Sequence, residues 1–249
     1  MRVAVLSDIH SNIEAFQAVV SDLEHRTDSI LNLGDLVGYN ASPNECVELA
    51  RDTGMQSIQG NHDQATCNLS LAESFNIFAR KAILWTRSVL TKNNMLFLHG
   101  LPESCRFHYA LACHGSPENT FSYIALPFQA RSTLKKMKKG LWGKAKICLF
   151  GHTHKRKIWQ RDVRGKVAPV EIPSDGTIIK LNEDDFYLLN PGSVGQPRNG
   201  DPRSSYFIFD TQDNTLKFRL VEYDLSETIK KIRNANLPEF FAERLVHGT

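Results

Sequence analysis

The chain has 249 residues, of which 41% are hydrophobic, and its formal net charge is +3. This length and composition suffice for one large α/β domain or two small ones with a proper core. The charge is too small for a nucleic-acid-binding surface, for which a clearly basic domain is expected. The sequence shows no secretory leader and no long apolar stretch, so neither secretion nor membrane insertion is predicted.

The five cysteines are scattered along the chain, and no two of them form a Cys-x-x-Cys pair. An odd, dispersed set is typical of reduced thiols and does not indicate a disulfide framework. We therefore expect a cytoplasmic protein.

In the first half of the chain, short apolar runs alternate with helical patterns, which is typical of β-α-β units around a mainly parallel sheet. The expected strands are Arg2 to Ser7, Ser29 to Leu33 and Met55 to Gln59, and the expected helices are Asn12 to about His25 and Pro43 to Thr53. The series Ser42-Pro43-Asn44-Glu45 predicts a capping box at the start of the second helix, which Gly54 can end.

The second half is richer in strands. Helices are expected between Leu71 and Leu90, then an antiparallel pair of strands, then a helix and a buried strand, then four more strands and two terminal helices. These elements are Met95 to His99, Tyr109 to Cys113, Phe128 to Lys139, Ile147 to Phe150, Lys157 to Arg161, Asp185 to Leu189, Ser205 to Asp210, Leu216 to Tyr223, Leu225 to Arg233 and Glu239 to Val246. The fold predicted is α/β, with two packed mixed β-sheets flanked by helices in one domain, 1–249, whose C-terminal helices span about 225–249.

Polar clusters follow five of the predicted strands, at the end where open α/β sheets bind ligands. The clusters are Asp8-Ile9-His10, Gly34-Asp35, Gly60-Asn61-His62-Asp63, His114-Gly115 and Gly151-His152-Thr153-His154. They supply seven candidate metal ligands, which are Asp8, His10, Asp35, Asn61, His114, His152 and His154. Oxygen and imidazole ligands together suit Mn, Fe, Co, Ni or Zn better than Mg or Ca, and we favour Mn. Seven ligands can fill two sites if one carboxylate bridges the ions, and Asp35 is the natural bridge.

Taken in order, these clusters resemble the calcineurin-like metallophosphoesterases motif by motif. The later segment Asn190 to Arg198 resembles the small prokaryotic phosphodiesterases of that family, including relatives that act on dinucleoside polyphosphates. The resemblance implies one metal site formed by Asp8, His10, Asp35 and His154 and a second formed by Asp35, Asn61, His114 and His152. It also implies that His62 is an acid that binds no metal.

The expected activity is hydrolysis of phosphate esters, with a hydroxide that bridges the two ions as the nucleophile. His62 would protonate the leaving group, and Asp63 would orient or tune His62. Arg198 is a candidate phosphate contact because its fork matches phosphate oxygens, and Tyr39 is a second candidate. The substrate expected is a small phosphorylated molecule, a nucleotide in particular, cleaved by a phosphodiesterase or pyrophosphohydrolase reaction.

Alternative functions are a phosphomonoesterase, including a protein phosphatase, and a non-catalytic scaffold of the same fold. No stable nucleic-acid complex is expected, because the chain has no clear track of aromatic and basic residues. The protein is compatible with a homo-oligomer.

Two structural questions follow from the sequence. The pair His99-Gly100 also ends a predicted strand and mimics His114-Gly115, but His114 begins the Gly-Ser-Pro loop typical of the resemblance, and we expect it to be the ligand. The segments Asn68 to Thr91 and Arg156 to Asp185 are both candidates to overhang the metals.

Overall fold

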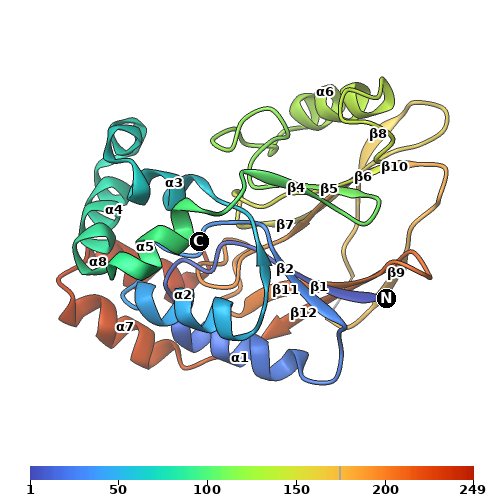
Figure 1. The fold of residues 1–249 in the computed structure, drawn as a ribbon. Helices are drawn as coiled ribbons and strands as arrows, with labels where there is room; N and C mark the ends of the chain where they lie inside the picture. Colours follow the sequence, from blue (N-terminus) through green and yellow to red (C-terminus); the bar gives the residue numbers. More distant parts are fainter. Residues whose placement is uncertain (174) are drawn as a thin grey trace.

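The computed structural model describes residues 1–173 and 175–249, and in these ranges two six-stranded mixed sheets lie face to face (Figure 1). The strand order of the first sheet is β3 (Gln56–Ser57), β2 (Ser29–Asn32), β1 (Arg2–Leu6), β11 (Ser204–Asp210), β12 (Thr215–Val221), β9 (Ile178–Lys180). The strand order of the second is β4 (Ser104–Phe107), β5 (Ala110–Cys113), β6 (Ile147–Leu149), β10 (Phe186–Pro191), β7 (Arg156–Arg161), β8 (Val167–Val170). The predicted α/β class with two packed mixed sheets is confirmed.

Each sheet contains a run of parallel strands. In the first sheet, β1 and β2 are parallel, with Val5 opposite Leu31, and β3 continues in the same direction. In the second sheet, β6 runs parallel to both β5 and β10. Because parallel strands end at the same edge of a sheet, the loops that follow β1, β2, β5 and β6 can meet.

The main core lies between the sheets, and β1 shows how the sequence builds it. Val3 and Val5 point into the cluster shared by both sheets, whereas Ala4 and Leu6 point to the other face of the first sheet, toward helices. Successive side chains of a strand alternate between faces, so a strand covered on both faces reads as one continuous apolar run. The run at Arg2 to Leu6 has this character.

Helices cover the outer faces of both sheets. The first sheet packs against α1 (Ile13–Leu23) and α2 (Pro43–Asp52), with α7 (Leu225–Asn234) beside α1. The second sheet packs against α6 (Pro127–Lys138). Among the described residues, no helix is long and apolar enough to cross a membrane.

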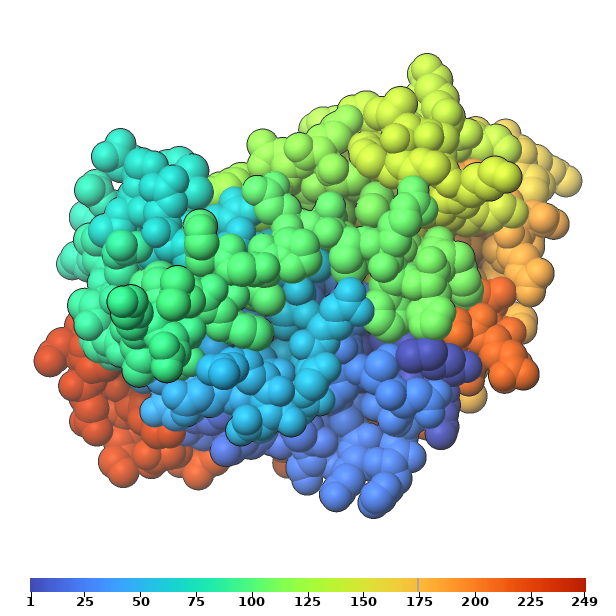
Figure 2. Space-filling model, viewed as in Figure 1, coloured from blue at the N-terminus to red at the C-terminus, as the bar shows by residue number. Residues whose placement is uncertain are grey.

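A second group of helices gathers at the end of the sandwich where β1 and β2 end (Figure 1). It comprises α3 (Asn61–Cys67), the 3-10 helix η1 (Leu69–Ser74), α4 (Ile77–Val89), α5 (Lys92–His99) and α8 (Glu239–His247). Figure 2 shows the teal surface around α4 and the red C-terminal helices on the same side of the molecule. This group therefore brings a middle segment of the chain and its C-terminus to one end of the fold.

The prediction of a strand at Met95 to His99 is wrong, because these residues belong to α5. Thr91 caps this helix by accepting a hydrogen bond from the Asn94 amide, and Leu98 is buried in the core beside α2. A short apolar run does not distinguish a strand from a buried helix turn. The antiparallel partner of β5 is β4, with Cys105 opposite Ala112.

The structure also bears on three smaller expectations. The second helix begins at Pro43 as predicted, but the Ser42 side chain makes no capping hydrogen bond. Gly54 follows that helix with a left-handed φ of 63°. The described residues of the segment Arg156 to Asp185 supply β7, β8 and β9, of which the last two are edge strands, and none of these residues lines the pocket above the proposed ligands.

The shared core generates a stability prediction. Phe207 is fully buried between the sheets and packs edge-to-face on Phe218, with ring centroids 5.3 Å apart. Phe207→Ala should lower the free energy of unfolding by about 3 to 5 kcal/mol, measured by denaturant titration. Phe128→Ala is the matched control, because Phe128 is 66% exposed and its loss should change stability by about 0.5 kcal/mol or less. Equal effects of the two changes would contradict this account of the core.

Candidate metal centre

The seven candidate ligands lie together at one end of the sandwich, and all of them are buried. Five of them are non-glycine residues with a left-handed backbone, namely Asp8, His10, Asp35, His152 and His154, with φ between 48° and 65°. Such conformations cost about 1 to 3 kcal/mol each and concentrate at functional sites. The loops after β1, β2 and β6 are therefore shaped to aim these side chains at a common point.

The two carboxylates each use one oxygen for the backbone and leave the other without a hydrogen bond. Asp8 Oδ2 accepts a hydrogen bond from the His152 amide at 3.1 Å, and Asp35 Oδ1 accepts one from the His62 amide at 2.8 Å. Asp8 Oδ1 and Asp35 Oδ2 are buried and have no hydrogen-bond partner. Because a buried carboxylate oxygen without a partner is costly, these two atoms are suited to bind a cation.

Imidazole nitrogens surround these free oxygens. Asp8 Oδ1 lies 3.3 Å from His154 Nε2 and 3.8 Å from His10 Nε2. Asp35 Oδ2 lies 3.5 Å from His10 Nε2 and 3.2 Å from His114 Nε2. Asp35 therefore lies between the two sets of ligands, as expected of a bridging carboxylate.

The remaining candidate ligands complete the second set. The Asn61 side-chain oxygen is 2.9 Å from His114 Nε2. Asp35, His114 and His152 offer ligand atoms that all lie within 4.8 Å of one another, as do Asp8, His10 and His154. The structure thus brings together both predicted groups.

Backbone carbonyls orient all four imidazoles. His10, His114 and His154 direct Nδ1 at the carbonyl oxygens of Val37, Leu33 and Gln196, at 3.1, 2.8 and 2.7 Å. His152 directs Nε2 at the Phe121 oxygen, at 3.3 Å. A carbonyl oxygen can only accept a hydrogen bond, so in each ring the nitrogen that faces the carbonyl carries the hydrogen. The other ring nitrogen is then free to bind a metal.

The charges within the centre also favour a cation. Burial raises the pKa of Asp8, and the nearby charge of Asp35 contributes to the rise, to about 7. Burial would lower the pKa of His114, but Asp35 and Asp8 raise it to about 9. The carboxylates therefore attract positive charge, and a divalent ion would compete with protons for these groups.

Asp63 contacts backbone amides and does not orient the His62 ring through a hydrogen bond. Its two carboxylate oxygens accept hydrogen bonds from the amides of Asp35, Val37 and Gly60 at 2.8, 3.1 and 2.9 Å, with a longer one from Leu36. No hydrogen bond joins Asp63 to the His62 ring among the described residues. The geometry makes Asp63 a positioning residue for the loop that presents Asp35.

His62 lines the pocket beside the proposed ligands. Its Nδ1 is buried without a hydrogen-bond partner, and a Cβ at Gly38 would lie 2.5 Å from that atom, so only glycine leaves room for the ring. Burial lowers the pKa of His62 to about 4, against the opposing charge of Asp35. His62 also lies within ligand range of His10 and Asp35.

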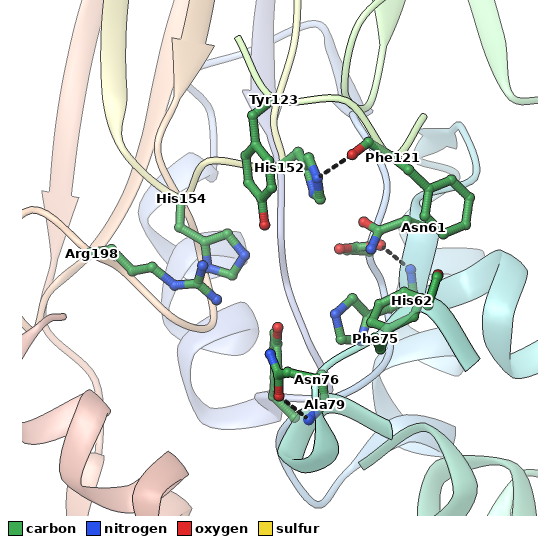
Figure 3. A pocket seen from close by; sticks show the side chains of 13 residues that line it. Asn61, His62, Phe75, Asn76, Ala79, Phe121, Tyr123, His152, His154 and Arg198 are labelled. Atoms are coloured by element: carbon green, nitrogen blue, oxygen red, sulfur yellow. Dashed lines mark hydrogen bonds between the residues drawn. The ribbon is translucent and has the colours of Figure 1, made fainter. Parts of the chain in front are cut away.

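The centre opens into a pocket of about 230 Å³. Figure 3 shows Arg198 and His154 on one side of this pocket and Asn61 and His62 on the other. Tyr39 also lines it, and the Arg198 guanidinium is 5.7 Å from the centre of the Tyr39 ring. Both predicted substrate contacts therefore face the space above the proposed ligands.

Sequence reasoning missed three aromatic residues of the pocket. Tyr123 stacks on His152 with ring centroids 4.0 Å apart, and Phe75 packs edge-to-face on His62 at 5.0 Å. Phe121 lies beside Phe75 at 5.9 Å. The aromatic loop directly after His114-Gly115 was the available signal for two of them.

The structure places both segments about which the sequence left a question. His99 is exposed at the end of α5 and is not among the pocket residues. Asn68 to Thr91 does overhang the site, because Ser74, Phe75, Asn76 and Ala79 line the pocket.

The profile of the calcineurin-like phosphoesterase superfamily domain matches residues 1–214. An uncharacterized protein of Methanocaldococcus jannaschii is 36% identical over 259 residues, covering 99% of this chain and 98% of the relative. A metallophosphoesterase from Sphaerobacter thermophilus, whose crystal structure is known, shares 36% sequence identity with this chain. The structural alignment covers 100% of both chains, with a TM-score of 0.85. A hypothetical protein of Pyrococcus horikoshii shares the fold at a TM-score of 0.80 and 20% identity, covering 100% of this chain and 98% of that one. The chain belongs to the calcineurin-like phosphoesterase superfamily, whose members generally bind divalent metal ions.

The contacts of Asp63 yield a prediction. In Asp63→Asn the amide nitrogen cannot accept, so at least one buried backbone N–H loses its partner at a cost of about 1 to 3 kcal/mol. Thermal stability and metal content should fall together, measured by thermal unfolding and elemental analysis. A variant that keeps its stability and its metals and loses only turnover would show that Asp63 acts on His62 instead.

Proposed function

We propose that this chain hydrolyses phosphate esters with the aid of two divalent metal ions, and that its substrates are phosphodiesters or pyrophosphate-linked nucleotides. The observation that supports the proposal is the pair of buried carboxylate oxygens, Asp8 Oδ1 and Asp35 Oδ2, that have no hydrogen bond and face the oriented imidazoles. When bound, such ions polarise phosphoryl oxygens and lower the pKa of water.

The donor atoms fit two transition ions better than two magnesium ions. One site would take Asp8, His10, Asp35 and His154, and the other would take Asp35, Asn61, His114 and His152. Four imidazoles and three oxygen ligands suit Mn, Fe, Co, Ni or Zn, and we favour Mn. A glycine at position 60 leaves room for the Asp35 carboxylate, because a Cβ there would lie 2.1 Å from Asp35 Oδ1.

His62 would donate a proton to the substrate, and Arg198 would bind it. A phosphate beside the His62 ring opposes the effect of burial and raises its pKa, so that His62 takes up a proton when substrate binds. That proton then passes to the oxygen of the leaving group. Arg198 would hold a phosphoryl oxygen through its guanidinium, since this side chain lines the pocket and has no carboxylate partner among the described residues.

The cysteines support the expected cytoplasmic setting. All five are free thiols, including Cys113 and Cys148, whose sulfurs are 3.7 Å apart without a bond. Reduced thiols of this kind are typical of a reducing compartment.

Metal removal tests the proposal directly. Hydrolysis of bis(p-nitrophenyl) phosphate should stop when a chelator is added, and Mn should restore it better than Mg because imidazole ligands favour transition ions. Elemental analysis should find up to two ions per chain. Full activity with the chelator present would refute the two-metal proposal, and a chain that binds no metal under saturating Mn would favour the non-catalytic scaffold.

Replacement of His62 separates chemistry from metal binding. In His62→Asn, kcat should fall by about 10² to 10⁴, the usual contribution of a positioned general acid, while both metals stay bound. The loss should be smaller for an aryl ester, because p-nitrophenolate leaves without a proton and an alkoxide needs one.

Two results would change the role of His62. If the variant lost its metals, His62 would be a ligand, as its closeness to His10 and Asp35 allows. If it remained fully active on an alkyl ester, another group would have to supply the proton.

A further inference from the structure

A second arginine lies near the pocket, on a part of the chain that the family profile does not include. Arg244 belongs to α8, whereas the profile ends at residue 214. Arg198 belongs to the loop after β10 and lines the pocket. The two half-buried side chains come from separate elements that the fold brings together.

Aromatic contacts fix the position of α8 against the pocket. Phe241 packs edge-to-face on the pocket residue Tyr39, with ring centroids 5.1 Å apart, and Phe240 stacks on Phe78 at 5.2 Å. The Arg244 guanidinium lies 4.9 Å from the centre of the Phe240 ring. Because residues three and four apart share a helix face, Arg244 lies on the side of α8 that faces Tyr39.

The end of α8 is also tied to the loop that carries Arg198. The Gly200 amide donates a hydrogen bond to the Gly248 oxygen at 2.8 Å. The Arg198 amide is itself held by the His154 oxygen at 3.2 Å. Backbone hydrogen bonds therefore link α8 to the loop that carries Arg198, and link that loop to the proposed metal ligand His154.

Neither arginine has an acidic partner. In the ranges that the structure describes, Arg203, Arg219 and Arg233 each form an ion pair with a carboxylate, but Arg198 and Arg244 form none. Arg198 donates to the Gln196 side-chain oxygen at 2.6 Å, and its Nε is buried without a hydrogen-bond partner.

The two positive charges also act on each other. Burial lowers the pKa of Arg244, and the charge of Arg198 lowers it further. Two unneutralised cations near one pocket attract an anion, and they repel each other without one.

The chemistry of this anion follows from its position. Arg198 lines the pocket together with the proposed ligand His154, whereas Arg244 is not a lining residue and belongs to α8, which packs on the outer side of the pocket through Phe241 and Tyr39. A phosphate held by the metals can reach Arg198, but Arg244 needs a second anionic group farther out. Guanidinium forks match phosphate oxygens in pairs.

We propose that Arg198 and Arg244 together bind a second phosphate group of the substrate, next to the one that is hydrolysed. The protein would therefore prefer substrates with two or more linked phosphates over those with one. This inference rests on the proposed function, because it assumes that the metals hold the first phosphate.

Calorimetric titration tests the subsite without relying on turnover. The ligands are AMP and α,β-methylene-ADP, which carries one more phosphoryl group joined through a methylene bridge that cannot be hydrolysed, and the protein is loaded with manganese. The wild type should bind α,β-methylene-ADP at least about tenfold more tightly than AMP, the usual size of a charge-assisted contact. Arg244→Gln should reduce this preference to about twofold or less.

Arg164→Gln is the matched control, because Arg164 is exposed and does not line the pocket. It lies in the turn between β7 and β8, and β8 is an edge strand of the second sheet. This variant should keep the full preference. Arg244→Lys retains the charge without the fork and should show an intermediate preference, which also carries the test if the glutamine variant fails to fold by circular dichroism.

The outcomes distinguish the two proposals. If the Arg244 variants keep the wild-type preference, or if the wild type shows none, the subsite is refuted even when bis(p-nitrophenyl) phosphate is hydrolysed. If the preference is present and depends on Arg244 but no phosphate ester is hydrolysed, the subsite is supported and the hydrolase is refuted.

Discussion

The burial of two neighbouring carboxylates is the constraint on which the rest of this site depends. Asp8 and Asp35 are almost completely inaccessible, and each keeps one oxygen free of hydrogen bonds. Two negative charges in such a place destabilise the fold unless positive charge is supplied. The four imidazoles, the left-handed loops and the backbone amides that hold the second oxygens all serve the same end, which is to make this place a cation site.

The two-sheet architecture makes the convergence possible. His10 and His154 are 144 positions apart in the chain, yet their Nε2 atoms are 3.1 Å apart. They meet because β1 of one sheet and β6 of the other end at the same side of the sandwich. The Gly151 loop is tied to the opposite sheet through Asp8, whose carboxylate accepts from the His152 amide. The sheets thus act as a rigid frame, and the short loops need only bridge the gap between them.

The sequence predicted the fold class, and it singled out residues that the structure brings together, because both depend on local order. Each motif follows directly after a strand, so a correct strand at Arg2 to Ser7 also places Asp8 and His10. The prediction failed where tertiary contacts decide the outcome. Met95 to His99 is apolar enough for either a strand or a helix, and only packing of Leu98 against the core makes it helical. Likewise, three of the four amides that bind Asp63 come from the distant loop after β2, which no spacing in the sequence reveals.

The sequence did not predict the aromatic residues of the pocket or Arg244, for a related reason. Phe75 and Arg244 join the pocket region only when α4 and α8 dock on the end of the sandwich, and the sequence carries no periodic signal of that docking. Residues that bind substrate by shape are set by such long-range packing, whereas metal ligands carry a motif that depends on their chemistry.

The loop that follows His114 has two roles. Its Phe121 carbonyl orients His152, and its Phe121 and Tyr123 side chains line the pocket. A ligand that fixes these rings also fixes the carbonyl, and with it the imidazole that would hold the second ion. Such coupling is reciprocal: if the ion raises the affinity for the ligand by some factor, the ligand raises the affinity for the ion by the same factor. If the proposed ion and substrate both bind, this loop would couple metal loading to substrate occupancy through one free energy.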